Sequence, residues 1–121
     1  MPYAFFDGDN IGDTIEKLLI EKRVDEATLL SENINKSVHN LEKLLRSKNG
    51  VEIIILGGDD LLIKFDSEEC DVKLLNEITI LFENTCGLSM SCGVGTTILE
   101  AIQNLHMAKL YGKNQIIGLR Q

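Results

Sequence analysis

Features of membrane, secreted or linker-rich proteins are scarce in this sequence. A single proline and no low-complexity tract give no sign of an interdomain linker, so we expect residues 1–121 to form one domain. No apolar run approaches the roughly 20 residues that span a bilayer, which argues against a membrane partner. The residues from Met1 to Phe6 run into Asp7 without a basic lead, so we expect no signal peptide and a cytoplasmic protein.

Cysteine and positive charge are also in short supply. The three cysteines, Cys70, Cys86 and Cys92, are odd in number and include no Cys-x-x-Cys pair, so neither a disulfide framework nor a zinc cluster is indicated. Cys92 lies in an apolar stretch, where we expect it to pack as a small hydrophobic side chain. The formal net charge of −7 argues against a long nucleic acid as partner, because affinity for a polyanion rests mainly on neutralised phosphates. A small anion held through a divalent cation remains compatible with this charge.

Apolar periodicity divides the chain into strands and helices. Short apolar or β-branched runs predict strands over residues 2–7, 51–56, 61–65, 88–94 and 115–119. Apolar residues three or four apart predict a short helix over 12–21 and three helix faces. The first face comprises Val24, Ala27, Leu30, Ile34, Val38, Leu41 and Leu45, the second Leu74, Leu75, Ile78, Leu81 and Phe82, and the third Ala101, Leu105 and Ala108. Thr96 or Thr97, followed by Glu100, predicts the N-cap of the last helix.

This order of elements predicts an α+β fold. The strands over 51–56 and 61–65 are separated by a glycine-bearing turn, which is typical of a hairpin. Helices on one face of a mainly antiparallel sheet would make a ferredoxin-like palm domain. Right-handed crossovers would place the first strand beside the hairpin. That placement would bring Asp7 next to Asp59 and Asp60.

Acidic residues stand where these strands end. Asp7 closes an apolar strand, and Asp59 and Asp60 follow Gly57 and Gly58 in the hairpin turn. Two carboxylates about 4 Å apart repel by roughly 4 kcal/mol at an effective dielectric of about 20, so three together require a cation or a shared proton. Hard oxygen ligands suit Mg²⁺ or Mn²⁺, and a pair of such ions serves phosphoryl transfer. The alternative is a polar turn without chemistry, since glycine and aspartate are common turn residues.

Three weaker signals lie elsewhere. Lys109 and Lys113, near the end of the last helix, would either stabilise that helix C-terminus or meet the phosphates of a triphosphate. The backbone N–H groups of residues 10–12, where a loop enters a helix, could cradle a phosphate. Gly93 and Gly95 lack the third glycine of a dinucleotide fingerprint, and we interpret them as strand-end geometry.

Four motifs in the same order give the chain a resemblance to a known family. Phe5-Phe6-Asp7-Gly8-Asp9-Asn10-Ile11-Gly12 and Gly57-Gly58-Asp59-Asp60 resemble the palm domain of the large polymerase subunit of type III CRISPR complexes. The resemblance is strongest to the free-standing minimal CRISPR polymerases, called mCpol. The chain is also similar, more distantly, to GGDEF diguanylate cyclases, which have counterparts of the stretches 91–95 and 108–114. Residues 3–117 are covered.

The resemblance implies a role for each matching residue. Asp7, Asp59 and Asp60 match the catalytic metal ligands, and the backbone of Gly8 is expected beside the same Mg²⁺ or Mn²⁺. The turn over 9–12 matches the segment that wraps the triphosphate tail, and the two lysines match phosphate contacts. The full set of implied nucleotide-binding residues is Gly8, Asp9, Asn10, Ile11, Gly12, Gly57, Gly58, Lys109 and Lys113. The family makes cyclic oligonucleotides, commonly from ATP, as second messengers in antiviral defence.

These observations predict a nucleotidyltransferase. A sugar hydroxyl of one nucleoside triphosphate would attack the α-phosphate of another, and pyrophosphate would leave. A homodimer with two facing sites would close a cyclic dinucleotide or a short cyclic oligonucleotide. One alternative is a non-catalytic palm that senses nucleotide and regulates a partner protein. Another is a cyclase that closes the ring within a single nucleotide.

Overall fold

The computed structural model describes residues 2–66 and 72–118. Along these residues the elements are β1 (Tyr3–Gly8), α1 (Ile11–Ile20), α2 (Val24–Arg46), β2 (Val51–Gly57), β3 (Asp60–Phe65), α3 (Val72–Cys86), β4 (Met90–Gly95), α4 (Ile98–Leu110) and β5 (Ile116–Ile117). Each agrees in type with its sequence prediction. The strand expected over 115–119 is shorter than predicted, and its last residue, like Cys70, lies outside the described residues.

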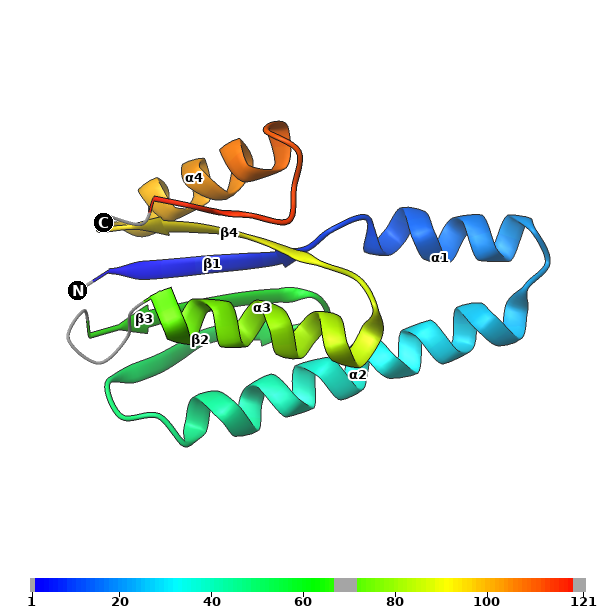
Figure 1. The fold of residues 1–121 in the computed structure, drawn as a ribbon, viewed down its shortest axis with the longest axis horizontal. Coiled ribbons are helices and arrows are strands. Elements are labelled where there is room, and N and C mark those ends of the chain that lie inside the picture. The colour runs from blue at the N-terminus through cyan, green and yellow to red at the C-terminus, as the bar shows by residue number, and fades with distance from the viewer. Residues whose placement is uncertain (1, 67–71, 119–121) are drawn as a thin grey trace.

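The strands form one sheet in the order β2-β3-β1-β4-β5 (Figure 1). All neighbouring pairs are antiparallel except β4 and β5, which are parallel. The predicted α+β palm fold is therefore confirmed, and so is the position of β1 beside the β2–β3 hairpin. In this register Asp7 lies opposite Asp60 on one side and opposite Ser91 on the other.

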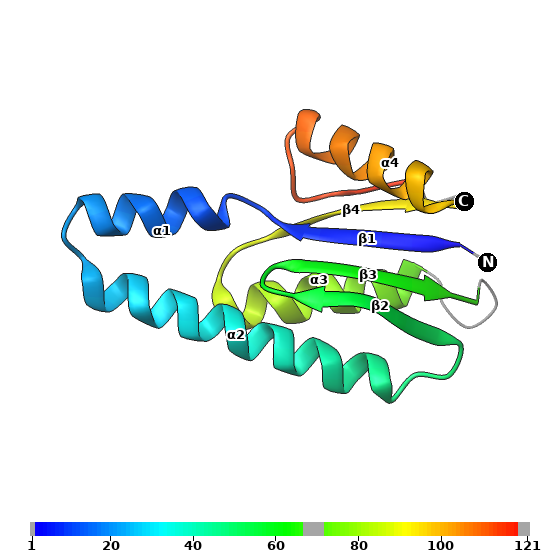
Figure 2. The ribbon, with the colours of Figure 1, turned by 180° about the vertical axis from the view of Figure 1, so that it is seen from behind.

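The helices cover both faces of the sheet. Met90, Cys92 and Val94 of β4 join the core formed with α2 and α3, and Cys92 is fully buried, as predicted. Gly93 alternates with these residues and meets the backbone of α4 instead. The expectation that the helices share one face therefore holds for α2 and α3, whereas α4 lies on the opposite face (Figures 1 and 2). Periodicity shows which side of a helix is buried, but it does not say which face of the sheet receives it.

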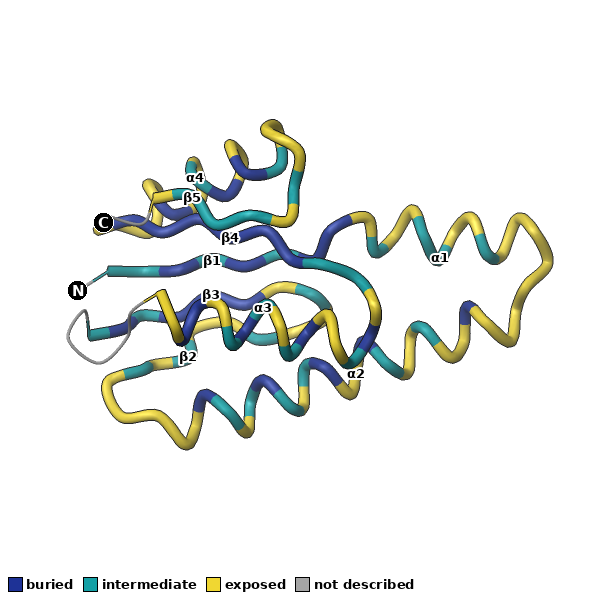
Figure 3. The backbone as a smooth tube through the Cα atoms, in the orientation of Figure 1, coloured by how far each residue is buried: buried dark blue, intermediate teal, exposed yellow. Residues whose placement is uncertain are grey.

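The α1–α2 pair extends beyond the sheet. Ile34, Leu41 and Leu45 of the predicted α2 face are buried, but Val24 at its start is 55% exposed. The N-terminal part of α2 passes the end of the sheet and runs beside α1, in which no residue is buried (Figure 3). The apolar spacing continues past the point where the sheet ends, so it includes Val24, which has no sheet to pack against. Within the described ranges, none of the helices combines the length and hydropathy that crossing a bilayer demands.

The start of α4 is capped as predicted. Thr97 is the N-cap, and its hydroxyl oxygen accepts the backbone N–H of Glu100 at 3.1 Å. This bond satisfies one of the first-turn N–H groups that have no partner within the helix. The cap sets where α4 begins, and thereby the position of Lys109 in its last turn.

Candidate active site

The hairpin turn and the end of β1 are joined by the backbone. Gly58 adopts φ 59°, a left-handed conformation that tight two-residue hairpins use and that a side chain would strain. The next residue, Asp59, accepts the N–H of Gly8 on its carbonyl oxygen at 3.1 Å. A Cβ at Gly8 would lie 3.0 Å from that of Asp59 and 2.6 Å from Cγ1 of Ile11. A glycine at position 8 is thus what allows the turn to approach β1 so closely.

Three carboxylates converge at this junction. One oxygen each from Asp7, Asp59 and Asp60 lies within 4.8 Å of the other two. Asp7 and Asp60 are direct cross-strand partners, a position in which like charges destabilise a sheet. The donor set consists of hard carboxylate oxygens only, which is the type that Mg²⁺ and Mn²⁺ take. The residues therefore fit a divalent metal site.

The environment shifts two of these carboxyls toward their protonated form. Burial and the neighbouring Asp7 raise the pKa of Asp60 to about 7. Burial and the charge of Asp7 also raise the pKa of Asp59. The common cause is that burial removes water from charges that already repel each other. A divalent cation would relieve both effects.

Folding stability without divalent cations is expected to increase as pH falls from about 8 to about 5, because folded Asp60 binds a proton before the unfolded chain does. Asp59, whose pKa is also raised, acts in the same direction. Urea denaturation in EDTA across this range measures the effect, and Asp60→Asn should make the dependence on pH shallower. An equally steep dependence in that variant would contradict the assignment.

Asp9 lies inside the protein. It is 3% exposed, and its carboxylate accepts the hydroxyls of Ser89 and Ser91 at 2.7 and 2.6 Å and the backbone N–H of Asn114 at 2.9 Å. Burial alone would raise the pKa of Asp9, but hydrogen bonds from Lys109, Ser89 and Ser91 outweigh it and hold the pKa below its ordinary value. The backbone N–H of Asp9 also donates to the carbonyl oxygen of Ser89 at 2.8 Å, so the predicted contact of residues 9–12 with a triphosphate would fall to residues 10–12.

Sequence reasoning did not single out Ser89, Ser91 or Asn114. The available signal was the alternation of serine with apolar residues over 88–92, since Ser91 lies in a strand whose residues are all buried. A buried hydroxyl needs a partner, and that partner is 80 or more positions away in the chain.

Lys109 reaches the end of β1 from the last turn of α4. Its ammonium nitrogen lies 3.1 Å from Oδ2 of Asp7 and 2.8 Å from Oδ1 of Asp9. It also donates to the backbone oxygens of Gly8 at 2.9 Å and Asp7 at 3.3 Å. Burial alone would lower the pKa of Lys109, but its bonds to Asp9 and Asp7 raise it above the ordinary value. The side chain is thus a permanent cation within the acidic site.

The loop before α1 carries the remaining predicted nucleotide contacts. Asn10 has φ 59° and accepts both the N–H and the hydroxyl of Thr14 on its carbonyl oxygen, at 2.9 and 2.6 Å. Lys113 donates a hydrogen bond to the side-chain oxygen of Asn10. The N–H groups of Ile11 and Gly12 lie in the first turn of α1, where no intrahelical acceptor is available. Lys113 therefore lies beside the loop that enters α1.

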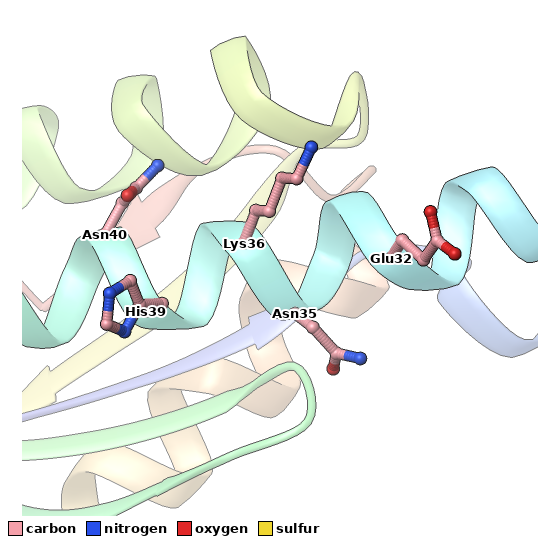
Figure 4. A pocket seen from close by; sticks show the side chains of 5 residues that line it. All are labelled: Glu32, Asn35, Lys36, His39 and Asn40. Carbon is pink, nitrogen blue, oxygen red and sulfur yellow. The ribbon is translucent and has the colours of Figure 1, made fainter.

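A separate hollow of about 380 Å³ lies on α2. Its lining comes from that helix alone and comprises Glu32, Asn35, Lys36, His39 and Asn40 (Figure 4). None of the three clustered carboxylates contributes to it. The arrangement there is a polar helix surface and adds no group to the site.

Both the sequence and the fold of this chain are similar to known proteins. Residues 3–119 match the family model for mCpol, the minimal CRISPR polymerase domain. A Csm1–Csm4 cassette in complex with cA4 is similar in structure, with a TM-score of 0.69 and 15% identity over 99% of this chain and 21% of that chain. The diguanylate cyclase SiaD with its activator SiaC from Pseudomonas aeruginosa has a TM-score of 0.58 and 14% identity, covering 96% of this chain and 48% of that chain. At these identities the likeness shows the fold alone.

A much longer protein is also similar in sequence to part of this chain. Dynein axonemal heavy chain 17 from Homo sapiens is 38% identical over 96 residues, which is 78% of this chain and 2% of that protein. The chain thus spans a small fraction of the dynein and about a fifth of the cassette chain. The dynein match carries no functional argument, whereas the mCpol match covers the acidic cluster, both lysines and every strand.

Proposed function

The chain belongs to the minimal CRISPR polymerase family, mCpol, and we propose that it condenses nucleoside triphosphates into a cyclic dinucleotide or short cyclic oligonucleotide. The convergence of Asp7, Asp59 and Asp60 is the observation that carries this proposal. Membership of a polymerase family, together with a fold shared with a diguanylate cyclase, supports nucleotidyl transfer as the type of reaction. The substrate, the product and the metal dependence are the parts that we propose.

Two groups of residues would bind the metal and the triphosphate. Asp7, Asp59 and Asp60, with the backbone of Gly8, would hold Mg²⁺ or Mn²⁺, which neutralises phosphate charge when bound. Gly57 and Gly58 place no side chain directly before these acids in the hairpin. The first-turn N–H groups of residues 11 and 12, together with Lys113, would hold the triphosphate tail at the N-terminus of α1.

The reaction is an in-line displacement. A sugar hydroxyl oxygen forms a bond to the α-phosphorus, the bond from that phosphorus to the β-phosphate oxygen breaks, and the hydroxyl proton is released as pyrophosphate departs. The residues above act by holding the two nucleotides in position and by countering charge, with no covalent intermediate. One site lies on each chain, so a homodimer would face two sites and let each nucleotide attack the other.

ATP is the favoured substrate. Csm1–Csm4 cassettes, which contain this fold, have been solved in complex with cA4, cA3 and pppApA, and from these adenine-containing ligands we propose ATP for this chain. An adenine-containing cyclic signal in antiviral defence, made in the cytoplasm, would accord with the family. The net charge of −7 favours a small metal-bound nucleotide over a long nucleic acid.

Purified protein incubated with ATP and Mg²⁺ is expected to release pyrophosphate and yield a cyclic dinucleotide, which mass spectrometry identifies. Sedimentation should show a dimer under the same conditions. Binding of ATP without pyrophosphate release would support the nucleotide-sensing alternative, and a cyclic mononucleotide would support ring closure within one nucleotide. Unreacted ATP and GTP with either Mg²⁺ or Mn²⁺ would overturn the enzymatic proposal.

A further inference from the structure

Lys109 matches a phosphate contact of its relatives, yet its ammonium is directed into the protein. We propose that Lys109 is a positioning residue, an internal counter-ion that holds the end of β1, and that Lys113 is the lysine that meets the triphosphate. This assignment rests on the proposed function. It concerns how the catalytic Asp7 is held rather than which reaction occurs.

The coordination of the ammonium carries the argument. A lysine ammonium has three donor hydrogens, and four oxygens lie within 3.3 Å of this one. Two belong to the carboxylates of Asp7 and Asp9, and two are backbone oxygens of Asp7 and Gly8. The Lys109 side chain is only 22% exposed. A phosphate would therefore have to displace existing acceptors before it could receive a hydrogen bond from this residue.

Asp9 is the reason that such a displacement is unfavourable. Its side chain is 2% exposed, and Lys109 is the cation that faces it, at 2.8 Å. If the ammonium moved to a phosphate, the buried Asp9 carboxylate would keep its three neutral donors and lose its counter-ion. Burying an uncompensated charge is costly. The pair is therefore more stable intact, with or without nucleotide.

The same carboxylate fixes the segment that carries Lys113. The Asp9 carboxylate accepts the backbone N–H of Asn114. Lys113 is the residue directly before Asn114 and has φ 66°. Lys113 is itself partly exposed, and its ammonium bonds to Asn10 at the loop before α1. Asp9 and Lys109 thus hold two things in place, the Asp7 carboxylate and the turn that presents Lys113.

Arginine distinguishes the two roles. A phosphate contact tolerates arginine, which binds phosphate well, whereas a site that encloses a compact ammonium does not accept the larger planar group. Lys109→Arg and Lys109→Met are both expected to lower kcat by ~10²-fold, as displaced catalytic groups do, with a smaller change in KM for ATP. Lys113→Met should instead raise KM by ~10-fold, the value of one charge-assisted hydrogen bond, and Lys113→Arg should recover part of that loss. Near-normal kcat in Lys109→Arg, or a rise in KM alone in Lys109→Met, would overturn the assignment.

A second measurement does not depend on catalysis. Asp9→Asn, Lys109→Met and the double variant form a cycle whose stability is measured by urea denaturation in the absence of nucleotide. The double variant should keep a folding constant ~10-fold or more above that expected from adding the two single effects, because Lys109→Met alone leaves the buried Asp9 carboxylate without its counter-ion, whereas in the double variant that charge is absent. Additive effects would overturn the proposal. If the wild-type protein converts no nucleotide, the proposed function fails, but this cycle still decides the place of Lys109.

Discussion

Replacing Asp59 and Asp60 together by asparagine is expected to lower nucleotide condensation by at least ~10³-fold, because several kcal/mol of charge stabilisation would be lost and each ~1.4 kcal/mol is a factor of ten in rate. Asparagine keeps the size of each side chain but removes two of the three charges that converge at the site. Pyrophosphate release from ATP and Mg²⁺ measures the loss.

The same variant is expected to be more stable than the wild type when EDTA removes divalent cations. Asp59 and Asp60 both have raised pKa values, so the folded protein at neutral pH bears repulsion that asparagine would relieve. A rise in Tm together with lost activity would mark a site kept for chemistry at the expense of stability. Asp25→Asn is the matched control, because Asp25 is an exposed acid at the start of α2. Undiminished synthesis in the doubly neutralised variant would rule out a catalytic role for the cluster.

Replacing Gly93 by alanine is expected to destabilise the fold by at least ~3 kcal/mol, the upper part of the range for overpacked interiors. A Cβ at this position would lie 2.1 Å from the carbonyl oxygen of Ala101 and 2.1 Å from the amide nitrogen of Leu105. Both are backbone atoms of α4, so the whole helix would have to move. Thermal denaturation should show a Tm lower by roughly 10 °C or more.

Displacement of α4 should also reduce activity, because Lys109 lies on that helix. Gly12→Ala is the matched control for stability, since a Cβ there would meet nothing within 4 Å. Its free energy of unfolding should change by less than ~1 kcal/mol. A Gly93→Ala variant as stable as Gly12→Ala would mean that α4 does not pack on β4 as the structure has it.

Much of the site could be predicted from sequence because its parts have strong local signals. Asp7 follows an apolar strand, and Asp59 and Asp60 follow two glycines in a hairpin turn. Strand pairing then brought these acids together, since β1 lies beside β3 with Asp7 opposite Asp60. The resemblance to mCpol, carried by the same motifs, agrees with the family match over residues 3–119.

The partners of buried polar groups could not be predicted in this way. Spacing at the end of the last helix left Lys109 with two interpretations, helix capping and phosphate contact. The structure shows a third, an ion pair with Asp9 across 100 positions of sequence. Gly93 was interpreted as strand-end geometry, whereas it is the point where α4 meets the sheet.

The sequence by itself determined the types of the elements, the set of acids and the family, because each is carried by short motifs or spacings that can be recognised one stretch at a time. The tertiary structure decided which face of the sheet α4 covers and which oxygens surround Lys109. The physical reason is that periodicity records whether a side chain is buried but not what it is buried against. A cation and a carboxylate 100 positions apart become partners only when β1, β4 and α4 have packed together.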